Sequence, residues 1–225
     1  MAAGTNLRDI RWIVFDAVGT ILFADPPVHM AYHRIGVKHG SKITPEEAHR
    51  RFRTALHQRL RDSLATSEAA EREFWKGVVG EVLPDVTDRE ACFTALFDHF
   101  ARPSSWGCYM DVEDTIEELR RRGVSIGVAS NFDARLHSIC DGHSALAGIS
   151  VRVISSEIGW KKPSREFFQA MMTRCGVSPE QILMIGDDRE NDVEAARAAG
   201  LRAIHLDRSG RGEDDAISTL DELLC

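Results

Sequence analysis

The sequence lacks the features that mark membrane proteins, secreted proteins and proteins that bind polyanions. It contains no apolar run of membrane-spanning length, and its amino-terminal stretch MAAGTNLRDI has no apolar signal core. The formal net charge of -7 opposes binding to nucleic acid or to anionic membranes. We therefore expect a cytoplasmic protein with no nucleic-acid partner and no membrane partner.

Cysteine is scarce and unpatterned. The chain has 5 cysteines, an odd number, and no CxxC pair. Widely spaced cysteines of this kind are typical of free thiols in a reducing compartment. They are Cys92, Cys108, Cys140, Cys175 and Cys225. Cys92 and Cys175 fall in helical patterns, so we expect them to pack in a core rather than to act in catalysis.

Repeats and low-complexity segments are absent as well, and aromatic residues make up only 7% of the chain. What remains is ordinary for a globular protein, because 43% of the residues are hydrophobic and 28% are charged. A chain of 225 residues can bury a full core without disulfides or metals. Its length fits one α/β domain, or a core domain that carries a smaller insertion.

Residues 10–20, IRWIVFDAVGT, begin with an apolar, β-branched and aromatic run and end in a glycine turn. We interpret the run as a short buried strand that ends at Asp16. In open α/β sheets, ligands bind at the carboxyl ends of the strands. Asp16 is therefore the first candidate site residue, although an Asp in this position also commonly caps the following turn.

The segment 25–100 carries helical signals and no convincing strand. Thr44 precedes a proline and two acidic residues, which is typical of a helix start. Residues 67–83 carry apolar residues at helical spacing. Thr87 and Glu90 form a capping-box pattern, which predicts that a further helix starts at Thr87. We expect this segment to form a helical insertion.

After residue 100 the pattern alternates between strands and helices. The expected strands are 124–129, 151–154, 182–185 and 201–206. Such alternation implies a parallel sheet with right-handed crossovers. We therefore predict an α/β protein with a Rossmann-like parallel core, residues 1–24 and 101–225, and an inserted helical cap, residues 25–100. The insertion follows the first strand, so it lies over the sheet edge that presents Asp16 and can act as a lid.

Four of the predicted strands, all but 201–206, are followed by residues suited to chemistry. In chain order these are Asp16, Gly19, Thr20, Ser130, Asn131, Lys161, Lys162, Asp187, Asp188 and Asp192. Clustered carboxylates repel one another unless a hard cation joins them, and oxygen ligands suit Mg²⁺. Mg²⁺, a lysine and a hydroxyl together neutralise a phosphoryl group, so that a carboxylate such as Asp16 can attack it.

The order of these motifs resembles the haloacid dehalogenase-like hydrolase superfamily over the whole chain except the insertion. Residues 16–20, DAVGT, match its first motif and Ser130 its second. Lys162, immediately before a proline, matches the third motif, and the segment 186–192 matches the fourth. The insertion resembles the helical cap of the family's first type. The resemblance implies a Rossmann-like hydrolase that acts on a small phosphorylated metabolite.

The resemblance also implies roles for individual residues. Asp16 would be the nucleophile and a Mg²⁺ ligand. The further metal ligands would be the backbone carbonyl of Val18 and the carboxylates of Asp187 and Asp192. Ser130 and Lys162 would hold the phosphoryl oxygens, and Lys162 would also restrain Asp16. The remaining substrate-binding residues would be Gly19, Thr20 and Asn131.

One position departs from the family's phosphatases. Their second aspartate, which serves as general acid and then as general base, is replaced here by Val18. Valine transfers no proton, and loss of a positioned general acid typically costs ~10² to 10⁴ in rate. Three interpretations follow, of which we prefer the first.

In the first, the protein is a Mg²⁺-dependent phosphatase or phosphotransferase that accepts good leaving groups or recruits a proton donor from the cap. The histidines available there are His29, His33, His57 and His99. In the second, it cleaves a carbon–halogen or carbon–phosphorus bond, as a 2-haloacid dehalogenase or a phosphonatase does. A phosphonatase needs a cap lysine, for which the candidates are Lys38, Lys42 and Lys76. In the third, it is a non-catalytic relative that binds a phosphorylated ligand or a protein.

Overall fold

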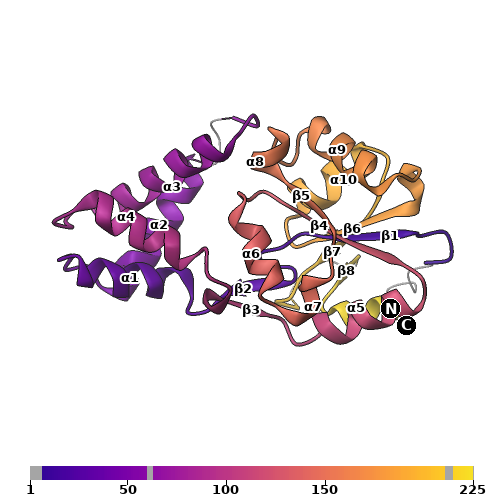
Figure 1. The fold of residues 1–225 in the computed structure, drawn as a ribbon, viewed down its shortest axis with the longest axis horizontal. Coiled ribbons are helices and arrows are strands. Elements are labelled where there is room, and N and C mark those ends of the chain that lie inside the picture. Colours follow the sequence, from indigo (N-terminus) through magenta and orange to yellow (C-terminus); the bar gives the residue numbers. More distant parts are fainter. Residues whose placement is uncertain (1–6, 60–62, 211–214, 225) are drawn as a thin grey trace.

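The computed structural model describes residues 7–59, 63–210 and 215–224, and its centre is a parallel sheet (Figure 1). The sheet has six strands in the order β5-β4-β1-β6-β7-β8, and every neighbouring pair is parallel. The strands are β1 Trp12–Phe15, β4 Ser125–Ser130, β5 Val151–Ile154, β6 Ile182–Gly186, β7 Arg202–Leu206 and β8 Ala216–Ile217. The predicted α/β fold with a parallel sheet is therefore confirmed.

Strand β1 is the point where the strand order reverses. It pairs with β4 on one side and with β6 on the other, and Phe15 lies opposite both Val128 and Ile185. In open α/β sheets, such a switch point opens a crevice beyond the carboxyl ends of the strands. Asp16, the residue after β1, lies at the mouth of this crevice.

Helices cover both faces of the sheet. Successive side chains of β1 point to opposite sides of the sheet and are buried on both, so each face needs a covering layer. Ile13 and Phe15 pack in one core cluster and Val14 in the other. Figure 1 shows α9 and α10 on one face and α5 and α7 on the other. The helices of this part are α5 Val112–Arg121, α6 Arg135–Asp141, α7 Ser144–Ala147, α8 Ser155–Ile158, α9 Arg165–Cys175 and α10 Ala195–Ala198.

A block of helices is inserted between two short strands. The helices are α1 Val28–Lys38, α2 Pro45–Arg59, α3 Glu68–Val82 and α4 Arg89–His99. The flanking strands are β2 Leu22–Ala24 and β3 Trp106–Cys108, which pair antiparallel. We call α1–α4 the helical block. It has its own buried core, which includes Tyr32, Val78 and Phe93, and Figure 1 shows it beside the sheet.

The predicted start of α4 is wrong by one residue. Asp88, not Thr87, is the N-cap, and its carboxylate accepts a hydrogen bond from the Ala91 amide at 3.0 Å. The Thr87 hydroxyl instead donates to the backbone carbonyl of His39 at 3.0 Å. Thr87 is therefore used for a contact between α1 and α4 that a local capping pattern does not reveal.

A π-helix and three short strands were not predicted. The segment before α10 is a π-helix, Arg189–Glu194, whose N-cap is Asp188. The strands β2, β3 and β8 have only two or three residues each, so they are too short to show an alternating pattern.

The cysteines agree with the expectation of free thiols wherever the structure describes them. Cys92 and Cys140 are buried, Cys175 is buried on α9, and Cys108 is partly exposed, all without a disulfide. Cys225 lies outside the described residues. Among the described residues, no helix combines the length and the apolar character that crossing a bilayer requires.

Candidate active site

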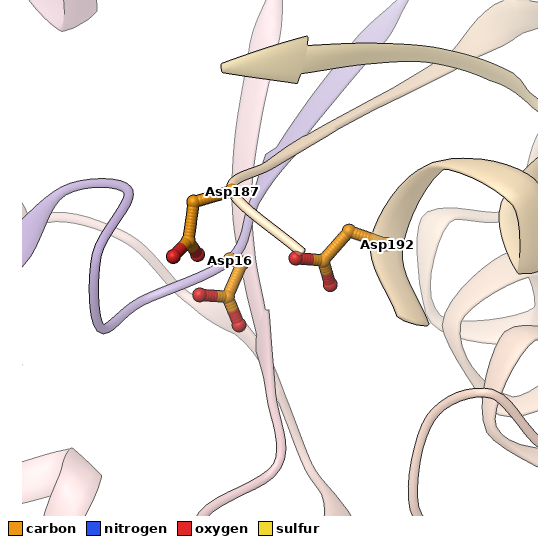
Figure 2. Close-up of side chains that lie close together, drawn as sticks. All are labelled: Asp16, Asp187 and Asp192. Carbon is orange, nitrogen blue, oxygen red and sulfur yellow. The ribbon is translucent and has the colours of Figure 1, made fainter. Parts of the chain in front are cut away.

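Three carboxylates meet at the carboxyl edge of the sheet. Asp16 follows β1, Asp187 follows β6, and Asp192 lies on the π-helix after it. One oxygen of each lies within 4.8 Å of the others, and Figure 2 shows the three side chains converging. Asp16 lies far from the other two in sequence, and the parallel pairing of β1 with β6 brings it beside them.

Lys162 is the cation that the fold supplies to this cluster. Its ammonium donates to Asp16 Oδ1 at 2.7 Å, to Asp192 Oδ1 at 2.5 Å and to the backbone carbonyl of Ala129 at 3.0 Å. The side chain is almost fully enclosed, and the residue is 4% exposed. Two ion pairs and a carbonyl bond offset the desolvation of this buried charge.

The cluster remains short of positive charge. Although Asp187 is solvent-accessible, partial burial and the nearby Asp16 carboxylate raise the pKa of Asp187 to about 6. Burial also raises the pKa of Asp192, and the Lys162 ammonium only partly opposes this. Burial by itself would lower the pKa of Lys162, but the Asp16 and Asp192 carboxylates raise it. One ammonium faces three carboxylates, so this oxygen-donor set fits a hard divalent cation.

Gly19 and Thr20 position Asp187. Gly19 has φ +95°, and a Cβ there would lie 2.3 Å from Asp187 Oδ2, so only glycine fits this turn. The buried Thr20 hydroxyl donates to Asp187 Oδ1 at 3.2 Å. Neither residue lines the cavity around the carboxylates. The structure therefore gives both of them a supporting contact rather than an exposed binding surface.

Ser130 is the last residue of β4 and Asn131 follows it, and both line this cavity. The Asn131 side chain accepts a hydrogen bond from the Lys162 amide at 2.7 Å and donates to the Lys162 carbonyl at 3.0 Å. Asn131 thus holds the lysine loop against β4. The cavity has a volume of about 210 Å³. Its lining comprises Asp16, Val18, Ser130, Asn131, Lys162, Asp187, Asp188, Asn191 and Asp192. We call it the polar cavity.

A second cavity adjoins the first and shares Val18 and Asn131 with it. Its volume is about 320 Å³, and it lies between the helical block and the sheet-containing part of the chain. We call it the apolar cavity, because aromatic and aliphatic side chains form most of its lining. Val18 is 40% exposed at the junction.

The residues that the sequence proposed as proton donors or lysine nucleophiles do not reach either cavity. Neither lining includes any of His29, His33, His57, His99, Lys38, Lys42 and Lys76. Lys76 instead pairs with Glu90 at 2.6 Å on the surface of the block. The lysine of the apolar cavity is Lys161, which pairs with the buried Glu71 at 2.8 Å. No sequence pattern links these two residues, since one lies on a helix of the block and the other on a distant loop.

Comparison with known proteins agrees with this geometry. The family model described as a haloacid dehalogenase-like hydrolase matches residues 10–200. The chain belongs to this family. This HAD-like hydrolase is 27% identical, over 209 residues, to haloacid dehalogenase-like hydrolase domain-containing protein 3 of Danio rerio. That match covers 88% of this chain and 86% of the fish protein.

Solved structures of the family superpose on nearly the whole chain. A HAD phosphatase from Thermococcus onnurineus is 26% identical with a TM-score of 0.69, and the match covers 95% of this chain and 96% of that one. A magnesium-bound HAD hydrolase from Bacillus subtilis has a TM-score of 0.80 at 17% identity, over 95% of this chain and 96% of the other. The second similarity is one of fold. Both agree with the hydrolase fold inferred from the motifs.

Proposed function

We propose that this HAD-like hydrolase is a Mg²⁺-dependent phosphatase or phosphotransferase. It acts on a small phosphorylated metabolite whose leaving oxygen departs without a proton. The observation that carries the proposal is the pairing of Asp16 with the buried Lys162 beside Asp187 and Asp192. This arrangement combines a fixed carboxylate nucleophile, a cation and an oxygen-donor set in one cavity large enough for a phosphoryl group.

The metal would be held by the carboxylates of Asp16, Asp187 and Asp192 and by the backbone carbonyl of Val18. When bound, Mg²⁺ supplies charge neutralisation for the phosphoryl oxygens. The chain's own residues set the rest of the geometry. Thr20 fixes the carboxylate of Asp187 through its hydroxyl, and the Asp188 amide donates to Asp192 Oδ2 at 3.2 Å.

The reaction proceeds in two displacements at phosphorus. A carboxylate oxygen of Asp16 attacks the phosphorus atom, and the bond between phosphorus and the leaving oxygen breaks with its electron pair on that oxygen. Water then attacks the aspartyl phosphate at phosphorus, which restores the Asp16 carboxylate and releases inorganic phosphate and a proton. Lys162 orients Asp16 and supplies positive charge beside the phosphoryl oxygens, and Ser130 donates a hydrogen bond to them.

Val18 restricts the first displacement. An alkoxide leaves poorly without a proton, whereas a carboxylate or phenolate is a weak base and leaves readily. No histidine lines either cavity in the described part of the chain, so none of the four cap histidines named above replaces the missing acid. Acyl phosphates and aryl phosphates are therefore the preferred substrates.

The helical block acts as the cap in this proposal, with residues 25–100 as the cap and residues 1–24 and 101–225 as the catalytic core. Contacts between the two parts support it. The Ala134 amide donates to Glu68 Oε1 at 2.9 Å, and Arg135 Nη1 donates to the carbonyl of Phe97 at 3.1 Å. Glu68 also accepts a short hydrogen bond from the Ser156 hydroxyl. These bonds hold α3 and α4 over the strand ends.

The deciding experiment is hydrolysis of acetyl phosphate with and without Mg²⁺. We expect Mg²⁺-dependent turnover in the wild type and a loss of about 10³-fold or more in Asp16→Asn. Asp98→Asn, which changes an exposed aspartate on α4, serves as the matched control and should retain full activity. Absence of phosphate release in the wild type, or full activity in Asp16→Asn, would refute the proposal.

A further inference from the structure

The apolar cavity has no role in the displacement at phosphorus, and its chemistry points to the rest of the substrate. We propose that it binds the leaving group, and that this group carries an uncharged apolar moiety the size of an aromatic ring. The proposal rests on the function proposed above and names the substrate class of the same site.

Continuity between the two cavities is the first support. Val18 and Asn131 line both, so a molecule whose phosphoryl group lies beside Asp16 extends past Val18 into the apolar cavity. Val18 presents methyl groups at this junction and is 40% exposed. A substituent that passes the junction therefore meets apolar surface.

The composition of the lining is the second support. The wall contributed by the helical block includes Phe52, Leu56, Phe74, Trp75 and Phe97, and Trp106 and Phe132 close the opposite side. Cavities of this kind bury apolar ligands, and aromatic walls favour rings through offset and edge-to-face contacts.

The charges in the lining are already paired, which is the third support. Glu71 is 6% exposed, pairs with Lys161 at 2.8 Å and accepts from the Thr66 hydroxyl at 2.7 Å. Arg135 pairs with Asp133 at 2.7 Å. Its guanidinium carbon also lies 3.7 Å from the centre of the Phe97 ring. The charged side chains of this lining thus have partners of their own, so a second anionic or cationic group on the substrate would be desolvated without one.

The volume is the fourth support. A cavity of about 150 Å³ is enough to hold benzene. The apolar cavity, at about 320 Å³, therefore holds a ring and the atoms that link it to the phosphate. Benzoyl phosphate meets both requirements. Its ring fits the apolar cavity, and its leaving group is a carboxylate, which departs without the proton that Val18 cannot supply.

Binding of two uncleavable probes tests the inference without relying on turnover. Phenylphosphonate and methylphosphonate carry the same phosphoryl anion and differ only in the apolar group. In the presence of Mg²⁺, we expect calorimetry to give phenylphosphonate a Kd at least 10-fold lower, because burial of a ring in an apolar site contributes at least that factor. Equal Kd values for the two probes would overturn the inference.

Variants of Leu56 test whether the ring of phenylphosphonate binds in the apolar cavity. Leu56→Trp fills the apolar cavity, and Leu56→Gln makes its wall polar with little change in helix propensity. Both should lower the ratio of the two Kd values to below about 3-fold while the Kd of methylphosphonate stays the same. Val37→Trp, on an exposed valine of α1, is the control and should keep the full ratio. An unchanged ratio in both Leu56 variants would place the ring elsewhere and overturn the inference.

Turnover separates this inference from the proposed function. We expect kcat/KM for benzoyl phosphate to exceed that for acetyl phosphate by at least 10-fold. If acetyl phosphate is hydrolysed through Asp16 with no gain for benzoyl phosphate, the inference fails and the proposed function stands. If neither is hydrolysed although phenylphosphonate binds at Leu56, the proposed function fails and the assignment of the cavity stands.

Discussion

The polar and apolar cavities touch at Val18, yet they are built in opposite ways. Most side chains of the polar cavity lie at or just after the ends of strands, and most are held by hydrogen bonds to partners distant in sequence, as Lys162 is to Asp16 and Asp192. The wall of the apolar cavity comes largely from the helical block, whose side chains pack without directional bonds. In the proposed function, the chemistry is therefore tied to the sheet, and the choice of leaving group is tied to the insertion.

The two constructions also respond differently to change. A buried charge network loses much of its stability when one member is removed, because the remaining charges stay desolvated. An apolar wall tolerates replacement of similar volume at small cost. Substitutions in the polar cavity should therefore affect folding and catalysis together, whereas those in the apolar cavity should change selectivity.

Lys162→Met should have the largest effect. It keeps the length of the side chain but leaves Asp16 and Asp192 without their shared partner. We expect unfolding to become easier by about 3–5 kcal/mol at neutral pH and phosphatase activity to be lost. Urea denaturation measures the first effect, and acetyl phosphate hydrolysis measures the second.

Lys161→Met provides the comparison for this variant. Lys161 pairs with Glu71, which keeps the Thr66 hydroxyl as a hydrogen-bond donor after the change. We expect a smaller loss of stability and retained turnover of acetyl phosphate. Equal losses in the two variants would contradict the distinction between the cavities.

The sequence was enough to predict that the carboxylates of the polar cavity meet, because their placement follows from the topology. Parallel strands bring their carboxyl ends to one edge, so the positions of Asp16, Asp187 and Asp192 after predicted strands were enough to expect that they meet. Asn131 was expected to bind substrate, but both of its amide atoms bond to the backbone of Lys162. A sequence indicates that a residue lies at an edge; it does not reveal which hydrogen bonds that residue has already made.

The apolar cavity could not be predicted in the same way. The apolar residues of the segment 67–83 were expected to share one face of a helix, and two of them, Phe74 and Val78, do contribute to the interior of the block. Helical spacing says which side chains share a face, but whether that face packs fully or leaves a space depends on the distance to the facing part of the chain. The pairing of Glu71 with Lys161 arises from the same placement, and no local pattern encodes it.

Val18→Asp, at the junction of the two cavities, should widen the range of leaving groups that the enzyme accepts. A carboxyl group two residues after Asp16 would supply the missing proton donor to the leaving oxygen. We expect turnover of an alkyl phosphate such as glycerol phosphate to rise by ~10²-fold or more, while acetyl phosphate turnover changes little. The measurement is phosphate release from both substrates under identical Mg²⁺ concentrations.

Val37→Asp controls for the added charge, since Val37 is an exposed valine of α1 that lines neither cavity. It should leave both rates unchanged. If Val18→Asp loses acetyl phosphate turnover without any gain on the alkyl ester, the assignment of Val18 to the leaving-group side is wrong.

Arg135→Lys should have the smallest of these effects. Arg135 connects the helical block to the sheet-containing part of the chain and takes no part in the displacement at phosphorus. Its guanidinium bonds to Asp133 through Nε and Nη2, donates to the Phe97 carbonyl and lies over the Phe97 ring. A lysine ammonium cannot make this planar set of contacts at once. We expect the free energy of unfolding to fall by about 1 kcal/mol, which lowers the Tm by about 2–4 °C in a chain of this size.

The same change at Arg121, whose side chain is 74% exposed in a surface pair with Glu118, should shift the Tm by less, because exposed ion pairs contribute little. Equal shifts in Tm for the two variants would mean that Arg135 does not couple the helical block to the sheet, and that the bonds of Glu68 and Glu71 carry this coupling instead.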